Sequence, residues 1–271
     1  MTISTAGEVA SDSSTYGLSN ANPDELRRLQ GLEAALDPTT TRHLDSIGVK
    51  LGWRCLEVGG GAGSIARWLA DRVGPSGHVT VIDLDPRFMR DLESDTVTVI
   101  QGDVTELDLG LSNYDLVHAR LLVEHLAEPA RAMQRLALAL APGGWMLIED
   151  GDFITSQALT PCAAYDRVRN ALFSIWGAKG AFQPAFGRTL PALMRSIGLR
   201  DVAAEGTVSF TDHDLNSPGR VIWSIMPSQF REQLLATGMV SDADIDDAIA
   251  FALDPTAEMM SPLVVSAFGR A

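Results

Sequence analysis

One segment, Arg54 to Ala70, constrains the fold of this chain more than any other, because glycine occupies positions 59, 60, 61 and 63 within it. The apolar run before these glycines ends near Glu57 and is typical of a buried strand. The residues after them place one apolar face at helical spacing: Ile65, Trp68, Leu69 and Val73. A glycine-rich turn between a strand and a helix lets a nucleotide-like ligand approach the backbone, because no side chain intervenes. The segment therefore predicts a binding loop in an α/β protein.

The glycine pattern alone permits more than one interpretation. The register Gly61-x-Gly63-x-x-Ala66 fits the dinucleotide-binding fingerprint, whose last position is Gly or Ala. A tight turn that binds nothing has the same composition, since glycine also serves turns. Residues further along the chain are needed to choose among these alternatives.

Strand-like and helix-like segments alternate from residue 53 onward, which predicts a parallel sheet. The predicted helices between the early strands include 63–73 and 129–141, and the second stops at Pro142-Gly143-Gly144. The fold class that we expect is α/β, with a seven-stranded, mostly parallel, doubly wound sheet and a helical cap. The predicted strands are 53–58, 78–84, 97–101, 114–119, 145–150, about 200–210 and 263–268.

The chain divides by composition into three parts. Residues 1–15 are rich in Ser and Thr and are expected to be disordered. Residues 16–50 are expected to form an N-terminal helical lid, because their apolar residues recur at helical spacing before the first predicted strand. Residues 51–271 form the expected main domain, with helical insertions at about 155–185 and 215–253.

Local signals define the ends of two of these helices. Asn22 is expected to cap the lid helix, with Glu25 completing a capping box, and Asp37-Pro38 is expected to end that helix before a second, short one. In the second insertion, Ser241 followed by Asp244 three residues later predicts a capped helix start.

Charge and cysteine usage exclude several classes of function. The formal net charge is −14 and the chain has no run of Lys and Arg, so nucleic acid is not expected as a substrate. No apolar run approaches the roughly 20 residues needed to cross a bilayer, and no signal peptide is evident, so no membrane partner is expected.

The two cysteines, Cys55 and Cys162, lie far apart in the sequence. Their separation argues against a disulfide framework and a zinc site and fits a cytoplasmic protein. A small molecule is the expected partner, and a homodimer is left open.

Polar residues follow three further predicted strands. Asp83 closes the second strand, about 20 residues beyond the glycine loop, where a carboxylate can accept hydrogen bonds from both hydroxyls of a ribose. Asp103 and Val104 follow the third strand. Open parallel sheets bind ligands outside the carboxyl ends of their strands. Three residues at the end of the fourth strand are therefore expected to face the same crevice: His118, Ala119 and Arg120.

The pattern Glu57-x-Gly59-x-Gly61-x-Gly63 resembles motif I of the class I S-adenosylmethionine-dependent methyltransferases. The Pro142-Gly143-Gly144 turn and a last strand after an inserted helical hairpin are similar to the same family, so the resemblance covers about residues 53 to 269. It implies S-adenosylmethionine as cofactor, with Asp103 receiving the adenine amino group and the next backbone amide meeting a ring nitrogen. The implied cofactor-binding residues are Tyr16, Glu57, Gly59, Gly61, Gly63, Asp83, Leu84, Asp103, Val104, His118, Ala119 and Arg120.

Methyl transfer needs an acceptor atom placed in line with the methyl group, and a base where the acceptor is a weak nucleophile. The candidate catalytic bases are His125 and His118, and His125 lies in a segment that resembles the family's histidine-containing segment after the fourth strand. Asp150 and Asp152 are alternatives, as a second base, an anchor for a substrate ammonium group or part of a Mg²⁺ site, but no metal is expected because partner ligands are not evident. The candidate acceptor-pocket residues are Trp176, Phe182 and Phe186, of which at least one is expected to pack in the core instead.

The resemblance implies a methyltransferase that acts on oxygen or nitrogen of a small, partly apolar acceptor of the specialised-metabolite type. Two alternatives stay open. The chain could bind the cofactor only structurally and catalyse a different reaction such as cyclisation, since cofactor motifs report binding and not turnover. It could also be a nicotinamide-dependent oxidoreductase, which the dinucleotide register permits but Asp103 and the late strand disfavour.

Overall fold

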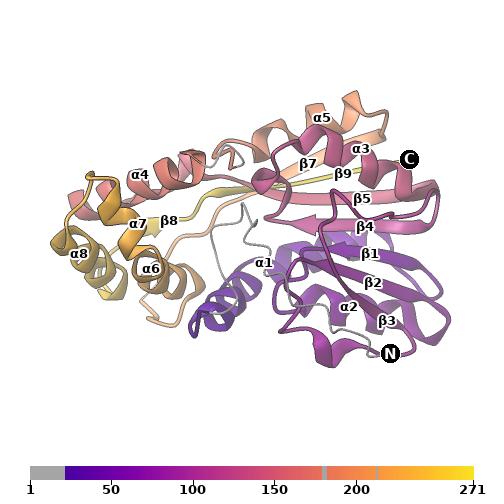
Figure 1. The fold of residues 1–271 in the computed structure, drawn as a ribbon, viewed down its shortest axis with the longest axis horizontal. Helices are drawn as coiled ribbons and strands as arrows, with labels where there is room; N and C mark the ends of the chain where they lie inside the picture. The colour runs from indigo at the N-terminus through magenta and orange to yellow at the C-terminus, as the bar shows by residue number, and fades with distance from the viewer. Residues whose placement is uncertain (1–21, 179–181, 212) are drawn as a thin grey trace, which may run out of the picture.

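A seven-stranded sheet with strand order β3-β2-β1-β4-β5-β9-β7 forms the centre of the molecule (Figure 1). The computed structural model describes residues 22–178, 182–211 and 213–271. Strands β1 to β5 pair in parallel, whereas β9 runs antiparallel to both β5 and β7. This confirms the predicted, mostly parallel sheet. The strands are β1 (Arg54–Val58), β2 (His78–Asp83), β3 (Val97–Gln101), β4 (Tyr114–Arg120), β5 (Leu140–Asp152), β7 (Arg200–Thr207) and β9 (Leu263–Arg270).

Helices cover both faces of the sheet (Figure 1). Helix α2 (Ser64–Val73) packs on one face together with Leu44 of α1 (Glu25–Ile47). Helices α3 (Pro129–Ala139) and α5 (Leu190–Ser196) pack on the other. Burial on both faces explains why the central strands have nearly continuous apolar sequences rather than alternating ones.

Helix α1 differs from the expectation, because it runs unbroken through Pro38 from Glu25 to Ile47. The prediction that Asp37-Pro38 ends the helix is wrong. Proline leaves one helical hydrogen bond unmade, while Thr41 donates its hydroxyl group to the carbonyl of Asp37 one turn back. Tertiary packing supplies the rest of the stabilisation, since Thr40 and Leu44 are fully buried against the sheet.

The start of α1 also differs. The N-cap residue is Asp24, and Asn22 accepts a hydrogen bond from the Asp24 amide at 3.0 Å instead of capping the helix itself. Glu25 makes no capping box. Its carboxylate instead pairs with Arg28 at 2.6 Å in a buried contact one turn along the same helix.

The boundary between helix α3 and strand β5 lies earlier in the chain than predicted. Helix α3 ends at Ala139, and β5 already begins at Leu140, so Pro142-Gly143-Gly144 lies inside the strand rather than before it. The pairing of β4 with β5 is irregular at this point, between Tyr114 and Leu116. Turn-forming residues therefore mark a break in strand register here and not the start of the strand.

A helical cap lies beyond the carboxyl ends of the parallel strands, and α1 runs between the cap and the sheet (Figure 1). It has its own apolar core, to which Leu172, Phe230 and Ile245 contribute. The predicted capping box of Ser241 and Asp244 is present at the start of α8. The cap consists of α4 (Ala163–Ala178), α6 (Pro218–Gln229), α7 (Arg231–Ala236), α8 (Asp242–Leu253) and the strand pair β6 (Gln157–Ala158) and β8 (Met259–Met260).

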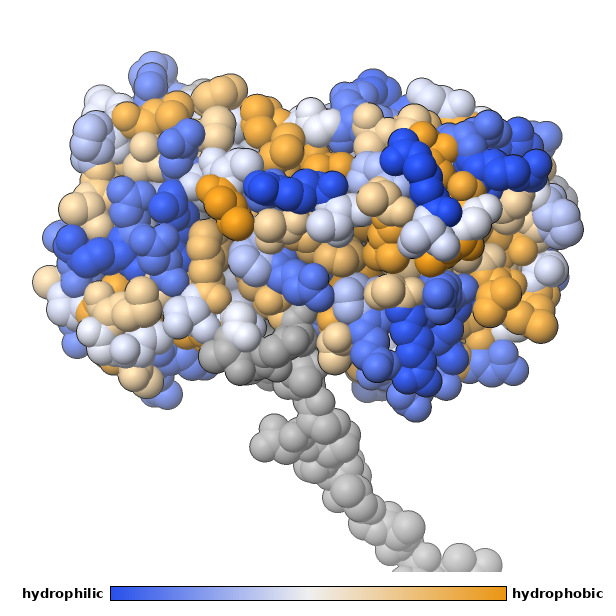
Figure 2. Space-filling model, turned by 90° about the horizontal axis from the view of Figure 1, so that it is seen from above, coloured by the Kyte–Doolittle hydropathy of each residue, from blue (hydrophilic) through white to orange (hydrophobic). Residues whose placement is uncertain are grey.

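The surface seen from above mixes polar and apolar residues over both the cap and the sheet (Figure 2). Among the residues that the structure describes, no helix combines the length and apolar character needed to cross a bilayer.

Candidate active site

The glycine loop between β1 and α2 forms one wall of a cavity of about 380 Å³. Gly59 and Gly61 both have positive φ, +73° and +61°, which glycine adopts without steric penalty. A Cβ atom on Gly59 would lie 2.8 Å from Cδ1 of Leu122, so this residue also has no room for a side chain. A Cβ on Gly61 would have no neighbour closer than Leu29, at 3.8 Å. The backbone at Gly61 is therefore open to a ligand, and we call this space the glycine-loop cavity.

Asp83 lies at the end of β2 and lines the glycine-loop cavity next to the loop itself. Its Oδ1 accepts a hydrogen bond from the Asp85 amide at 2.8 Å, and its Oδ2 accepts from the Gly61 amide at 3.4 Å. Burial raises the pKa of the Asp83 carboxyl, because the cavity screens its charge poorly. A partly buried carboxylate with two backbone donors still has lone pairs for hydroxyl groups of a ligand.

Asp103 and Val104, after β3, line the same cavity. Oδ1 of Asp103 accepts hydrogen bonds from the amide and the hydroxyl of Thr105, at 2.8 and 2.7 Å. This is a local turn interaction. It uses Oδ1 only, so the structure is compatible with both a turn role and a ligand role for Asp103. Leu84 also lines the cavity and is 50% exposed.

His118 does not face either cavity, contrary to the expectation for the end of β4. It is fully buried, with Nδ1 2.6 Å from Glu57 Oε2 and Nε2 3.3 Å from Glu149 Oε2. Burial on its own lowers the pKa of His118, but the two carboxylates outweigh burial and raise that pKa to about 9. His118 is therefore a buried cation between two strands at neutral pH, and the geometry does not support it as a base. Ala119 is likewise buried and lines neither cavity.

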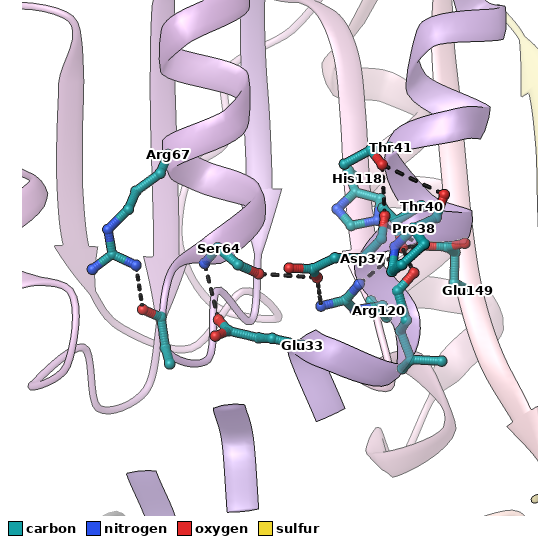
Figure 3. A network of polar contacts seen from close by, with 12 residues as sticks. Glu33, Asp37, Pro38, Thr40, Thr41, Ser64, Arg67, His118, Arg120 and Glu149 are labelled. Carbon is teal, nitrogen blue, oxygen red and sulfur yellow. Dashed lines mark hydrogen bonds and ion pairs between the residues drawn. The ribbon is translucent and has the colours of Figure 1, made fainter. Parts of the chain in front are cut away.

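Glu149 joins this buried group to helix α1 (Figure 3). Its carboxylate accepts hydrogen bonds from the hydroxyls of Thr40 on α1 and Ser266 on β9, each at 2.5 Å. Burial raises the pKa of Glu149, but His118 and the two hydroxyls outweigh it and lower that pKa to about 2. Glu57 of motif I lines the glycine-loop cavity, so the network reaches from the ligand wall to the lid helix.

Arg120 also reaches α1 from the end of β4 (Figure 3). It donates to Thr40 Oγ1 at 2.8 Å and to Asp37 Oδ1 at 2.9 Å, and it lines the glycine-loop cavity. The Ser64 hydroxyl donates to the same Asp37 oxygen at 3.0 Å, and the Ser64 amide donates to Glu33 at 2.9 Å. Helix α1 is thus fastened to the glycine loop and to β4. The predicted lid residue Tyr16 lies outside the described residues.

A second cavity, of about 370 Å³, lies between α1, the segment that follows β4 and the cap, and we call it the aromatic cavity. Its aromatic rings are in mutual contact, with centroids of Trp176 and Phe182 5.1 Å apart and those of Phe153 and Phe182 5.3 Å apart. The predicted pocket residues Trp176 and Phe182 line it, whereas Phe186 is buried in the core beneath the sheet. Phe186 therefore takes the core-packing role that was expected for at least one of the three. Further lining residues are Phe173, Trp223, Met226 and Met259.

Three residues line both cavities: Leu32, Leu121 and His125. Leu121 has a φ of +50°, a strained conformation for a side chain of this size. The His125 ring lies 5.2 Å from that of Phe182, and burial together with the positive charge of Arg28 lowers the pKa of His125 to about 4. His125 is therefore neutral at neutral pH and stands where the two cavities meet.

Sequence reasoning missed Glu124, the residue before His125. Its side chain is fully buried, and Oε1 lies 3.4 Å from His125 Nε2. Asp150 is also fully buried beside it, and Asp152 pairs with Arg188. Burial raises the pKa of Glu124 well above its usual value and that of Asp150 to about 7. The dipeptide Glu124-His125 was the only available signal, because the approach of Asp150 depends on the pairing of β4 with β5.

Comparison with known proteins finds methyltransferases that are similar to this chain. Residues 56–148 match the methyltransferase domain family. The chain is 27% identical over 184 residues to methyltransferase str2 of Strobilurus tenacellus, covering 67% of this chain and 66% of that protein. It is 28% identical over 138 residues to the ubiquinone/menaquinone biosynthesis C-methyltransferase UbiE of Pseudomonas paraeruginosa, covering 48% and 53%. The chain thus spans about half to two thirds of the length of these curated relatives.

Solved structures share the fold. A putative sarcosine dimethylglycine methyltransferase from Galdieria sulphuraria superposes with a TM-score of 0.53 at 15% identity, covering 86% of this chain and 83% of that one. The phosphoethanolamine N-methyltransferase 2 of Haemonchus contortus, solved with phosphomonomethylethanolamine and S-adenosylhomocysteine, gives 0.54 at 17% identity, covering 86% and 52%. At these identities the likeness concerns the fold.

Proposed function

We propose that this chain is a class I S-adenosylmethionine-dependent methyltransferase and that it transfers a methyl group to oxygen or nitrogen of a small, largely apolar acceptor; its similarity to the methyltransferase domain family and to methyltransferase str2 supports this. The observation that carries the proposal is the meeting of two cavities at Leu32, Leu121 and His125. One cavity has the polar groups for a nucleoside and the other is aromatic. A transfer reaction needs this arrangement, because donor and acceptor atoms must meet in line.

The glycine-loop cavity suits S-adenosylmethionine by the chemistry of its walls. Asp83 can accept hydrogen bonds from both ribose hydroxyls, and the open backbone at Gly61 leaves room for the methionine half. Asp103 and Val104 line the same cavity and can offer an adenine a hydrogen-bond acceptor and a backbone amide. When bound, S-adenosylmethionine supplies an activated methyl group, so the protein has only to orient the acceptor and remove its proton.

The walls of the aromatic cavity support an aromatic or otherwise apolar acceptor. Ring faces of Phe182 and Trp176 favour a flat apolar molecule, and the thioethers of Met226 and Met259 adapt to irregular shapes. Neutral His125 can accept a hydrogen bond from an acceptor hydroxyl or amine. We therefore propose a specialised metabolite of this kind as the acceptor. The net charge of −14 supports a small molecule over a nucleic acid.

Calorimetry with S-adenosylhomocysteine and with NAD tests the cofactor part of the proposal. We expect the first to bind and the second not to bind. Tight binding of NAD would instead favour the oxidoreductase alternative.

Radiolabelled S-adenosylmethionine, incubated with a panel of small phenols, aromatic acids and aromatic amines, tests the transfer part. We expect label to appear in an organic-extractable product with the wild type and to be strongly reduced with Asp83→Ala. Cofactor binding without transfer to any member of a broad panel would favour a cofactor-binding protein with a different reaction.

A further inference from the structure

We propose that the acceptor is an elongated molecule with a second polar group, a neutral hydroxyl or carbonyl, which the hydroxyl of Ser217 binds at one end of the aromatic cavity. This inference rests on the proposed methyl transfer and names the class of acceptor for the same site. Ser217 lines the aromatic cavity and not the glycine-loop cavity. It is therefore assigned as a residue that determines acceptor specificity at a distance from the cofactor.

The aromatic cavity is long, because it follows two helices that lie side by side, α1 and α6 (Figure 1). These helices run in opposite directions. Gln229 at the end of α6 donates to Glu25 at the start of α1 at 3.0 Å, whereas Gly31 of α1 lies next to Val221 near the start of α6. The α1 residues that line the cavity fall between positions 28 and 36. A helix rises 1.5 Å per residue, so this wall is about 12 Å long, which exceeds the length of a single aromatic ring.

The two ends of the aromatic cavity differ in polarity. At the end where α6 stops, the ring of Trp176 contacts those of Phe182 and Phe230, with centroids 5.1 and 5.7 Å away. At the end where α6 begins, hydroxyl side chains line the cavity, and they belong to Ser209, Thr211, Ser217 and Ser261. An acceptor that fills the cavity therefore meets aromatic rings at one end and hydroxyl groups at the other.

Ser217 differs from its neighbours because its hydroxyl group is not used by the protein. Oγ1 of Thr211 accepts a hydrogen bond from the Met259 amide at 2.9 Å, and the Ser261 hydroxyl donates to the Pro262 carbonyl at 2.9 Å. The hydroxyl of Ser217 is buried, yet it has no hydrogen-bond partner within the ranges that the structure describes. A buried polar group without a partner lowers stability, so a ligand that supplies the partner explains it.

The position of Ser217 in the chain offers its side chain a bond that it does not make. Ser217 is the N-cap residue of α6, with φ −58° and ψ 141°, but its side chain makes no capping hydrogen bond. Serine is favoured at an N-cap because its oxygen usually accepts a bond from an amide of the first turn. The Ser217 hydroxyl is thus left to a group in the cavity, to which it can donate or from which it can accept.

The charges that line the aromatic cavity favour a neutral group at this end. The ionisable lining residues are Arg28, Glu124 and His125. They belong to α1 and to the segment after β4, and none belongs to the segments around Ser217. A charged group would lose its hydration there without gaining a counter-ion, which is unfavourable, whereas a hydroxyl or carbonyl needs only one hydrogen bond.

Two probes that differ by one hydroxyl group test the proposal: 4,4′-dihydroxybiphenyl and 4-hydroxybiphenyl. Both are long and apolar, but only the first has a second polar group at its far end. Calorimetry measures their affinities for the full chain, alone and saturated with S-adenosylhomocysteine. We expect the dihydroxy probe to bind about 3- to 10-fold more tightly, which is the usual net effect of one hydrogen bond.

Two serine variants on one helix identify the group that causes this preference. Ser217→Ala should weaken the dihydroxy probe by the same factor and leave the monohydroxy probe nearly unchanged, so that the two affinities become equal. Ser224→Ala is the matched control, because the Ser224 hydroxyl donates to the Val221 carbonyl at 2.9 Å and the residue does not line the cavity. This control should keep the full preference of the wild type.

Equal affinities of the two probes for the wild type would overturn the proposal, as would a preference that survives Ser217→Ala. Failure of both probes to bind would also overturn it, because an elongated cavity should accept them. If Ser217→Ala does not fold, the wild-type comparison decides. The affinity for S-adenosylhomocysteine, measured on the same samples, tests the proposed function separately, since the probes can be titrated without it.

Discussion

We propose Asp83 as the residue that contributes most to cofactor recognition. Replacing Asp83 by Ala removes two charge-assisted hydrogen bonds to ribose hydroxyls, so we expect S-adenosylhomocysteine to bind more weakly by about 1.5–3 kcal/mol, roughly 10- to 150-fold. Calorimetry measures this loss. Asp91→Ala, which changes a 71% exposed carboxylate outside the cavity, is the control and should leave affinity unchanged. Unchanged affinity in folded Asp83→Ala would remove Asp83 from the ribose site.

At the scale of single residues, local sequence predicted one half of the site better than the other. The glycine loop, Asp83 and Asp103 line one cavity as expected, because position at a strand end is enough to place them. His118 also lies near the end of a strand, but its ring is buried between the carboxylates of Glu57 and Glu149 and does not line the cavity. That orientation depends on carboxylates 61 and 31 residues away in sequence. No local pattern shows them.

Among the elements, α1 is the one that we propose as a lid, and its two halves should behave differently. The first half, residues 25–36, contributes Leu32 to both cavities, whereas the second half carries buried Thr40 and Leu44. We expect S-adenosylhomocysteine to increase hydrogen-exchange protection in 25–36, because a lid orders over its ligand, and to leave 40–47 unchanged. Exchange measured by mass spectrometry tests this, with α3 as the reference helix.

Equal protection of residues 25–36 with and without ligand would mean that the whole of α1 is permanently packed against the protein.

The sequence predicted a break at Pro38 because proline disrupts a helix that has no tertiary contacts. It does not give the tertiary bonds of Thr40 to Glu149 and Arg120 that hold the helix together beyond that point. The capping box at Ser241 was predicted correctly, since all of its atoms lie within four residues.

For the molecule as a whole, His118 links β1, β4 and β5, and through Glu149 also β9 and α1. The pKa of His118 is raised from 6.5 to about 9, so its stabilisation is fully present below pH 6.5 and is lost as pH rises through 9. The pKa of Glu149 is lowered from 4.5 to about 2, so its stabilisation is present above pH 4.5 and is lost as pH falls through 2. We expect this group to stabilise the fold most between about pH 4.5 and 6.5.

Replacing His118 by Gln should lower the free energy of unfolding by about 3–5 kcal/mol near pH 6, because two buried carboxylates lose their cation. It should also remove the fall in stability between pH 7 and 9. Urea denaturation at several pH values measures both effects. His78→Gln, at a half-buried histidine whose ring bonds to Thr98 and to neither carboxylate of the buried group, is the control. A variant as stable as the wild type at pH 6 would contradict the assigned charge of His118.

Pro38 lies between the half of α1 that covers the cavities and the half that packs against the sheet. Its nitrogen carries no hydrogen, so one backbone hydrogen bond of the helix is missing at this point. A helix bends most easily at such a point, so Pro38 is a natural hinge. Because Leu32 belongs to both cavities, one swing about this hinge would uncover cofactor and acceptor together, once the bonds of Glu33 and Asp37 to the glycine loop and β4 are broken. Their exchange would then share one rate. Pro38→Ala should slow both association and dissociation of S-adenosylhomocysteine in stopped-flow fluorescence, with its Kd changed much less than either rate.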